Sequence, residues 1–146
     1  MGNVQGPTTR RSVLKSTKAL PLRKEKPMEV QNILEIIVKT LDKKKATDIQ
    51  VLGIDELTVI SDYFVIATAS NTTLLKALAN EVEFELDKVD VKLHAKEGFD
   101  SNAWILLDYG NVIVHLFLND SRAFYSLERL WTDAKQIDIQ SMLEEA

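Results

Sequence analysis

The side chains that could carry catalysis are few, and their spacing matches no established catalytic arrangement. The titratable residues that could converge in the fold are three aspartates and both histidines, namely Asp48, Asp62, Asp108, His94 and His115. His115 lies in an apolar run where strand alternation places it on the same face as Ile113 and Phe117. This position favours a hydrogen-bonded core or interface histidine over a general base. We therefore predict no catalytic residues and no enzymatic activity.

Metal and nucleotide sites have equally little support in the sequence. There is no cysteine, and the two histidines form neither an HxxxH nor an HxH pair, so we expect no metal site. Gly53, Gly98 and Gly110 form neither a GxGxxG loop nor a Walker A loop, so we expect no cofactor. A metal-dependent nucleotidyltransferase needs a Gly-Ser pair followed by two carboxylates on alternate strand positions, and no such acidic pair follows Ala69-Ser70.

Charge is divided unevenly along the chain, and the composition changes before Met28. Residues 1–27 hold seven basic residues and one acidic residue, a net charge of +6. Because the whole chain has 18 basic and 22 acidic residues, residues 28–146 keep 11 basic and 21 acidic, a net charge of −10. Nucleic-acid binding is driven by cations that release condensed counterions, so the acidic part favours a basic protein partner over RNA, and we expect no DNA partner. No apolar run approaches the ~20 residues of a membrane-spanning helix, so we expect no membrane partner.

Three segments have the apolar spacing of amphipathic helices. The first helix is predicted from Met28 to the lysines at 43–45, where cations suit the negative end of the helix dipole. The second is predicted to begin after a cap at Ser70 or Asn71. The third has an apolar stripe, more typical of packing than of docking, made of Phe124, Leu127 and Trp131.

Short runs of β-branched and aromatic residues predict five strands, at residues 49–52, 63–68, 91–93, 104–107 and 112–118. The last two strands are joined at Asp108-Tyr109-Gly110-Asn111, which predicts a hairpin. This order of elements indicates an α/β fold, a single domain with a mixed central β-sheet flanked by helices. The order is similar to that of nucleotidyltransferase-like domains, without their catalytic motif. We predict a domain over residues 28–134 and a polar, weakly patterned tail over residues 135–146.

Two stretches of sequence carry a family resemblance. The first joins DIQVL at 48–52 to SDYFVIAT at 61–68. The second begins with EGF at 97–99 and continues through WILLDYG at 104–110, VIVHLF at 112–117, RAFYSLERLW at 122–131 and DA at 133–134. From about Met28 to about Ala134 the chain resembles the Iojap-like ribosomal silencing factors.

The resemblance implies an activity that needs no chemistry. Members of this family bind ribosomal protein L fourteen on the large ribosomal subunit and block the small subunit sterically, which represses translation; many are dimers when free. The acidic domain suits a basic ribosomal protein, and we expect the end of the hairpin to gather aromatic and acidic anchors. The expected partner-binding residues are Trp104, Asp108, Tyr109, Gly110, Tyr125, Glu128 and Arg129.

Several of these residues have an alternative structural role. Trp104 shares a strand face with Leu106, so it is either a core residue or a contact residue. Asp108 and Gly110 are also suited to shaping the turn, since aspartate accepts backbone hydrogen bonds and glycine tolerates positive φ. Glu128 and Arg129, expected as contacts, are alternatively a solvated ion pair. The sequence leaves these roles open.

The chain departs from the family pattern at three places. Gly53 stands where an acidic residue is usual, Thr73-Leu74 replaces a usual basic pair, and Asn111 replaces a common aspartate. These departures leave open whether the start of the second helix makes its usual contacts. Two other functions remain as alternatives: a large-subunit assembly factor that uses the same contact, and a metal-dependent nucleotidyltransferase-like enzyme.

Residues 1–27 form a basic segment rich in proline, glycine and hydroxyl side chains, which predicts a disordered arm. Three interpretations remain open: an expression leader ahead of a start at Met28, an organelle-targeting sequence, or an arm that touches ribosomal RNA. We expect a cytoplasmic protein, or a mitochondrial or chloroplast protein if the arm is a targeting segment.

Overall fold

A computed structural model describes residues 29–100, 103–119 and 132–143 of the chain. In these residues it contains three helices, α1 (Val30–Lys43), α2 (Thr72–Lys88) and α5 (Gln140–Leu143). It also contains six strands, β1 (Thr47–Gly53), β2 (Tyr63–Ala69), β3 (Ala95–Glu97), β4 (Trp104–Asp108), β5 (Val112–Leu118) and β6 (Lys135–Ile137). The predicted α/β class is confirmed.

The strands form one mixed sheet in the order β3-β4-β5-β2-β1-β6. Among these six described strands, only the central pair, β2 and β5, is parallel, with Ile66 opposite His115. The other pairs are antiparallel, and β4 and β5 form the predicted hairpin with Trp104 opposite Phe117 and Asp108 opposite Ile113. A parallel pair needs a long connection, which α2, β3 and β4 supply here.

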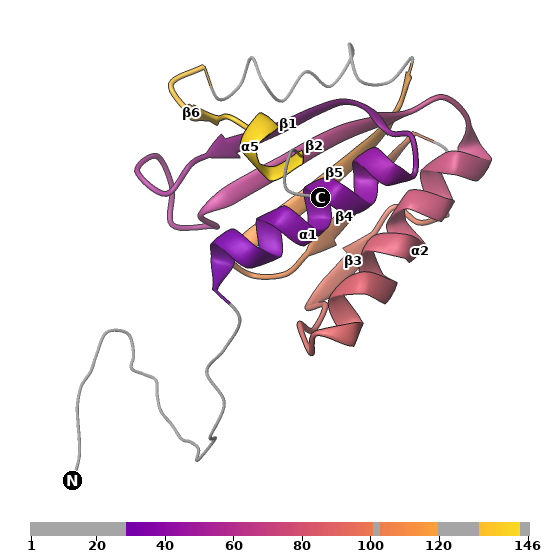
Figure 1. Ribbon diagram of the computed structural model, residues 1–146, viewed down its shortest axis with the longest axis horizontal. Coiled ribbons are helices and arrows are strands. Elements are labelled where there is room, and N and C mark those ends of the chain that lie inside the picture. The colour runs from indigo at the N-terminus through magenta and orange to yellow at the C-terminus, as the bar shows by residue number, and fades with distance from the viewer. Residues whose placement is uncertain (1–28, 101–102, 120–131, 144–146) are drawn as a thin grey trace, which may run out of the picture.

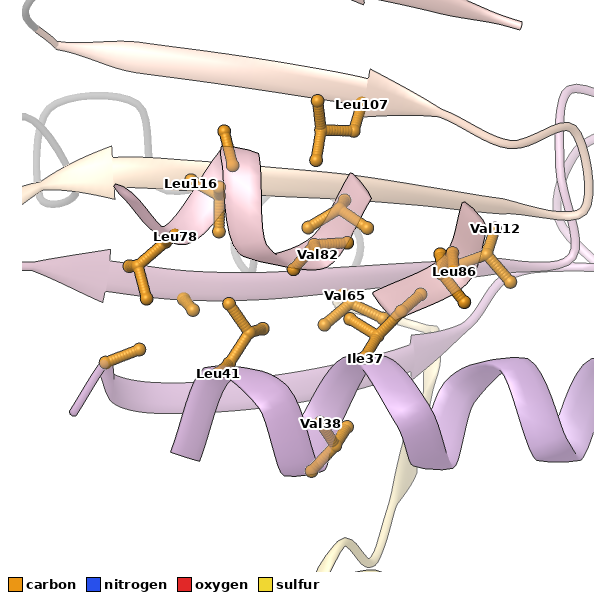
Figure 2. Close-up of a cluster of buried hydrophobic side chains, with 14 of the residues drawn as sticks. Ile37, Val38, Leu41, Val65, Leu78, Val82, Leu86, Leu107, Val112 and Leu116 are labelled. Carbon is orange, nitrogen blue, oxygen red and sulfur yellow. The ribbon is translucent and has the colours of Figure 1, made fainter. Parts of the chain in front are cut away.

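The three helices cover one face of the sheet, as Figure 1 shows. The main core lies between them and this face, where apolar side chains of α1 and α2 meet those of the central strands (Figure 2). Ile37 of α1, Leu78 and Leu86 of α2, and Val65 and Leu116 of the sheet are fully buried there. The helices therefore hold the hairpin and the central strands in place from one side.

The opposite face of the sheet has its own apolar cluster. Its buried members are Leu52, Ile54, Phe64, Ile66, Ile113 and Phe117. Trp104 and Leu106 of β4 are only partly buried and pack against this second cluster. Both faces of the central strands are therefore apolar, which explains why β2 and β5 read as nearly continuous apolar runs.

Helix and strand ends follow from local chemistry. The predicted cap of α2 is Asn71, whose side-chain oxygen accepts a hydrogen bond from the backbone N–H of Leu74 at 2.8 Å. β1 begins at Thr47, two residues earlier than predicted. Its pairing with β2 shifts register between Thr47 and Gln50, where Asp48 has φ +54°. A bulge of this kind interrupts the alternation on which the prediction relied.

Two predictions about local structure were wrong. The predicted strand at residues 91–93 lies four residues too early, since β3 spans Ala95–Glu97. Val91 and Leu93 are partly buried and pack against the main core without belonging to a strand. Hydrogen bonding to β4 begins later, where the backbone N–H of His94 donates to the carbonyl of Asp108 at 2.8 Å. Residues 135–146 were predicted to be a tail, yet β6 pairs with β1 and Met142 of α5 is buried. Short edge elements give too few residues to establish a period.

Candidate partner-binding surface

The turn between β4 and β5 is held by one side chain and shaped by one glycine. Asp108 Oδ1 accepts a hydrogen bond from the backbone N–H of Gly110 at 2.8 Å. Gly110 has φ +87°, and a Cβ at this position would lie 2.9 Å from Cε1 of His94. A residue with a side chain would be strained there. The turn-shaping role offered as the alternative for Asp108 and Gly110 is therefore confirmed.

The same turn is tied to the loop that joins β1 to β2. The hydroxyl of Ser61 donates to the carbonyl of Gly110 at 2.9 Å. The backbone N–H groups of Asp62 and Tyr63 both donate to the carbonyl of Asn111 at 3.0 Å. Three hydrogen bonds therefore hold the hairpin turn and the β1–β2 loop as neighbours at one end of the sheet.

Tyr109 packs into the main core on the side of α2, and only 7% of its surface is exposed. Its buried hydroxyl has no hydrogen-bond partner among the described residues. Burial raises the pKa of Tyr109, and the nearby carboxylates of Glu83 and Asp87 raise it further, so the phenol stays neutral. Its remaining surface lines a hollow of about 250 Å³ together with Phe84 of α2. Tyr109 is thus chiefly a packing residue that positions the turn.

Trp104 lies at the other end of β4 and on the other face of the sheet. Its ring stacks on Phe117 with 5.2 Å between ring centroids, and its Nε1 donates to Nδ1 of His115 at 3.2 Å. The expectation that the hairpin end gathers Trp104 with Tyr109 was wrong. Tyr109 comes five residues after Trp104, directly after the end of β4, and alternation continued past Asp108 sends the two side chains to opposite faces of the sheet.

His115 lies beneath Trp104 and is 4% exposed. Its ring packs edge-on against Phe64, with 4.7 Å between the ring centroids. Burial lowers the pKa of His115 to about 4, so the imidazole is neutral at physiological pH. The prediction of a hydrogen-bonded core histidine is confirmed, and the sequence signal was the apolar alternation of β5.

Three residues of β4 share the sheet face that carries the second cluster: Trp104, Leu106 and Asp108. We call them the β4 strip. All three are partly buried, so each keeps some surface exposed to solvent. The strip combines an aromatic ring, a side-chain type that is enriched in protein interfaces, with an aliphatic side chain and a carboxylate.

Three predicted contact residues, Tyr125, Glu128 and Arg129, lie outside the described residues, as do Phe124, Leu127 and Trp131. Their assignment stays a prediction. Among residues 29–100, 103–119 and 132–143, no group of three or more histidine, aspartate or glutamate side chains could hold a metal ion. In the same part of the chain, no helix is long and apolar enough to cross a membrane.

One surface feature was missed by the sequence analysis. Leu57, Val59 and Ile60, in the loop between β1 and β2, expose 42%, 102% and 65% of their surface. The sequence signal for this exposed patch is the short apolar run Leu57-Thr58-Val59-Ile60, which lies between the acidic residues at 55–56 and Asp62.

The similarity of this chain to known proteins shows the family to which it belongs. The family model described as "Ribosomal silencing factor during starvation" (RsfS) matches residues 27–146. The chain belongs to the RsfS family. Ribosomal silencing factor RsfS of Bacillus subtilis strain 168 is 36% identical over 112 residues, which make up 77% of this chain and 95% of that protein. The resemblance inferred from the sequence motifs is thus confirmed.

RsfS relatives also occur among organelle proteins. Protein Iojap, chloroplastic, of Zea mays is 35% identical over 103 residues, 70% of this chain and 45% of that protein. Mitochondrial assembly of ribosomal large subunit protein 1 of Mus musculus is 31% identical over 108 residues, 68% of this chain and 45% of that protein. A crystal structure of a Chromobacterium violaceum protein has a TM-score of 0.70 at 35% identity, covering 72% of this chain and 88% of the other. The RsfS fold is therefore shared.

Proposed function

We propose that this chain is a regulator of translation that binds the large ribosomal subunit through ribosomal protein L fourteen and blocks subunit joining. The observation that carries the proposal is the β4 strip, a partly exposed row of Trp104, Leu106 and Asp108 on a strongly acidic domain. The names of the bacterial relatives support a role at the ribosome. Gly110 and Tyr109 act in this proposal by fixing the turn at the end of the strip.

The charge of the domain supports a basic protein as the partner. Residues 28–146 carry a net charge of −10, so they attract a basic surface and repel bare phosphate backbones. Long-range attraction of this kind raises the association rate, whereas packing of the aromatic and aliphatic side chains slows dissociation. A bound chain then blocks the small subunit by its volume, and it needs affinity for the large subunit but no catalysis. Tyr125, Glu128 and Arg129 remain proposed contacts, and a dimer of the free protein remains a proposed state.

The test is co-sedimentation of the purified chain with isolated large subunits, together with light scattering of subunit joining. We expect the parent chain to pellet with large subunits and to slow their association with small subunits. Trp104→Ala should weaken pelleting, while Phe84→Ala, at an exposed aromatic residue on α2, should not. Circular dichroism must first show that both variants are folded. A parent chain that ignores large subunits would refute the proposal.

A second candidate function is assembly of the large subunit, and the name of the mouse relative favours it. The same contact would then be made on an immature particle. Parallel binding assays with precursor and mature large subunits separate the two roles. Assembly predicts tighter binding to precursors and no effect on joining, whereas silencing predicts binding to mature subunits and slower joining.

The compartment also remains a proposal. A cytoplasmic location fits the bacterial relatives, and a mitochondrion or chloroplast fits the organelle relatives. Residues 1–27 fused to a fluorescent protein distinguish these cases, since a targeting segment carries the reporter into an organelle and an expression leader does not.

A further inference from the structure

Exposed apolar side chains are concentrated in one loop. Among the described residues, four large apolar side chains are exposed, and three of them lie between β1 and β2. These are Leu57, Val59 and Ile60, which we call the apolar knob. Single exposed apolar residues are ordinary, but neighbouring ones mark a contact surface.

The loop that carries the knob has a defined conformation. Its base is closed by a hydrogen bond from Ile54 N to Asp62 O at 2.9 Å. One turn follows, in which the N–H groups of Leu57 and Thr58 donate to Ile54 O at 2.9 and 3.1 Å. The hydroxyl oxygen of Thr58 then accepts from Ile60 N at 3.2 Å. Since Ile54 is fully buried in the second cluster, the loop is anchored at its base and presents the knob outward.

The knob lies at the same end of the sheet as the hairpin turn. The Ser61 hydroxyl and the Asp62 and Tyr63 N–H groups bond to the carbonyls of Gly110 and Asn111, as described above. The loop between β1 and β2 is seen at the left of Figure 1, beside the turn that joins β4 to β5. A partner surface that covers the turn is therefore within reach of the knob.

The surroundings of the knob are acidic. Asp55 and Glu56 are exposed just before it, and they line a hollow of about 190 Å³ with Asp133 and Lys135. Carboxylates at this position repel the phosphates of RNA and of anionic lipid headgroups. A protein surface with an apolar centre and a basic rim suits both the knob and its acidic neighbours.

We propose that the apolar knob is a second contact of this chain with its ribosomal partner, seated in an apolar depression that basic side chains surround. This inference rests on the proposed function and extends its surface from the β4 strip, past the turn, to the loop between β1 and β2. The partner is a basic protein of the large subunit, and the knob supplies the apolar part of a surface otherwise dominated by charge.

The test replaces two of the three knob side chains, the two that are most exposed. Val59→Ser with Ile60→Ser removes two exposed apolar groups, and Phe84→Ser removes one on α2 as the matched control. Binding of each fluorescently labelled protein to isolated large subunits is measured as a Kd. We expect the double variant to raise the Kd at least tenfold, about 1.4 kcal/mol, while Phe84→Ser leaves it unchanged. Thermal unfolding of all three proteins should coincide.

The outcomes separate this inference from the proposed function. If the parent chain binds large subunits and the double variant binds with the same Kd, the knob proposal is wrong while the proposed function stands. A parent chain that does not bind at all refutes the proposed function, and the knob proposal with it. Sedimentation equilibrium and flotation with phosphatidylcholine vesicles test the other occupants. A dimer or vesicle association lost in the double variant, with an unchanged Kd for subunits, assigns the knob to a second copy or a lipid surface and overturns the proposal.

Discussion

The indole Nε1 of Trp104 donates a hydrogen bond to Nδ1 of His115 at 3.2 Å, linking the β4 strip to the interior of the sheet. An acceptor nitrogen must be unprotonated, so the bond exists only while this imidazole is neutral. His115 is 4% exposed, and burial lowers its pKa to about 4 from the ordinary 6.5. Trp104 of the β4 strip is therefore held in place by the buried, neutral imidazole of His115.

This pKa predicts a loss of stability in mild acid. The unfolded chain takes up a proton at His115 near pH 6.5, whereas the folded chain resists until about pH 4. The stabilising contribution is fully present above the unfolded pKa and is lost as the pH falls through this window. A difference of this size corresponds to roughly 3 kcal/mol. Urea unfolding at half-unit steps from pH 7.5 to pH 4 measures it.

His115→Gln provides the control, because its amide oxygen can still accept from Trp104 but does not titrate in this range. We expect the variant to have a flatter stability profile between pH 6.5 and pH 4 than the parent. Parallel profiles would show that other groups cause the acid sensitivity.

The glycines predict a graded series of stabilities. Gly98 has φ +78°, and an added Cβ would collide with the carbonyl oxygen of Trp104, so Gly98→Ala should cost about 3 kcal/mol or more. Gly110→Ala should cost about 1–2 kcal/mol, since the obstacle is the movable ring of His94. At Gly53 a Cβ has ordinary contacts of 3.6 Å and longer, so alanine should stabilise by about 0.5 kcal/mol. Chemical unfolding ranks the three variants.

A second measurement separates the causes at Gly110. Removing the ring in a His94→Ala background should relieve the contact and leave only the strain of positive φ. If Gly110→Ala costs the same in both backgrounds, the His94 ring is not an obstacle. Gly53→Ala as the most damaging of the three would contradict the whole ranking.

The sequence predicted those elements that have a long and unbroken period. The positions of β2 and β5 were predicted to within one residue and that of α1 to within two, and α2 begins after Asn71 as predicted. β3 and β6 have three residues each, and their pairing depends on neighbours that are distant in sequence. Such edge strands carry no alternation of their own, which is why one was misplaced and the other missed.

The site was predicted in part, for a related reason. Turn chemistry is local, so the roles of Asp108 and Gly110 could be read from the residues themselves. Which face Tyr109 joins depends on α2 covering that side of the sheet, a contact between segments far apart in the sequence. The knob escaped because exposure of Val59 is a property of the folded loop and not of residue type.

The hydroxyl of Tyr109 predicts an unusual response to its removal. It is buried and has no hydrogen-bond partner among the described residues, so the folded state gains nothing from it. Tyr109→Phe should leave the stability unchanged or raise it by up to about 1 kcal/mol. Tyr109→Ala should lose about 3 kcal/mol, because the ring fills the core beside α2. Thermal and urea unfolding compare the two, and a marked loss in Tyr109→Phe would reveal a partner for the hydroxyl.

Asp108 carries both a structural and a proposed electrostatic role, and two substitutions separate them. Asp108→Asn keeps an oxygen that can accept from Gly110 N but removes the charge, so its stability should stay within about 0.5 kcal/mol of the parent. Asp108→Ala loses the bond and should cost about 1 kcal/mol. If the carboxylate faces a basic ribosomal protein, both variants should bind large subunits several-fold more weakly, with a smaller dependence on salt. Unchanged binding by a folded Asp108→Asn would confine this residue to the turn, leaving Trp104 and Leu106 as the functional part of the β4 strip.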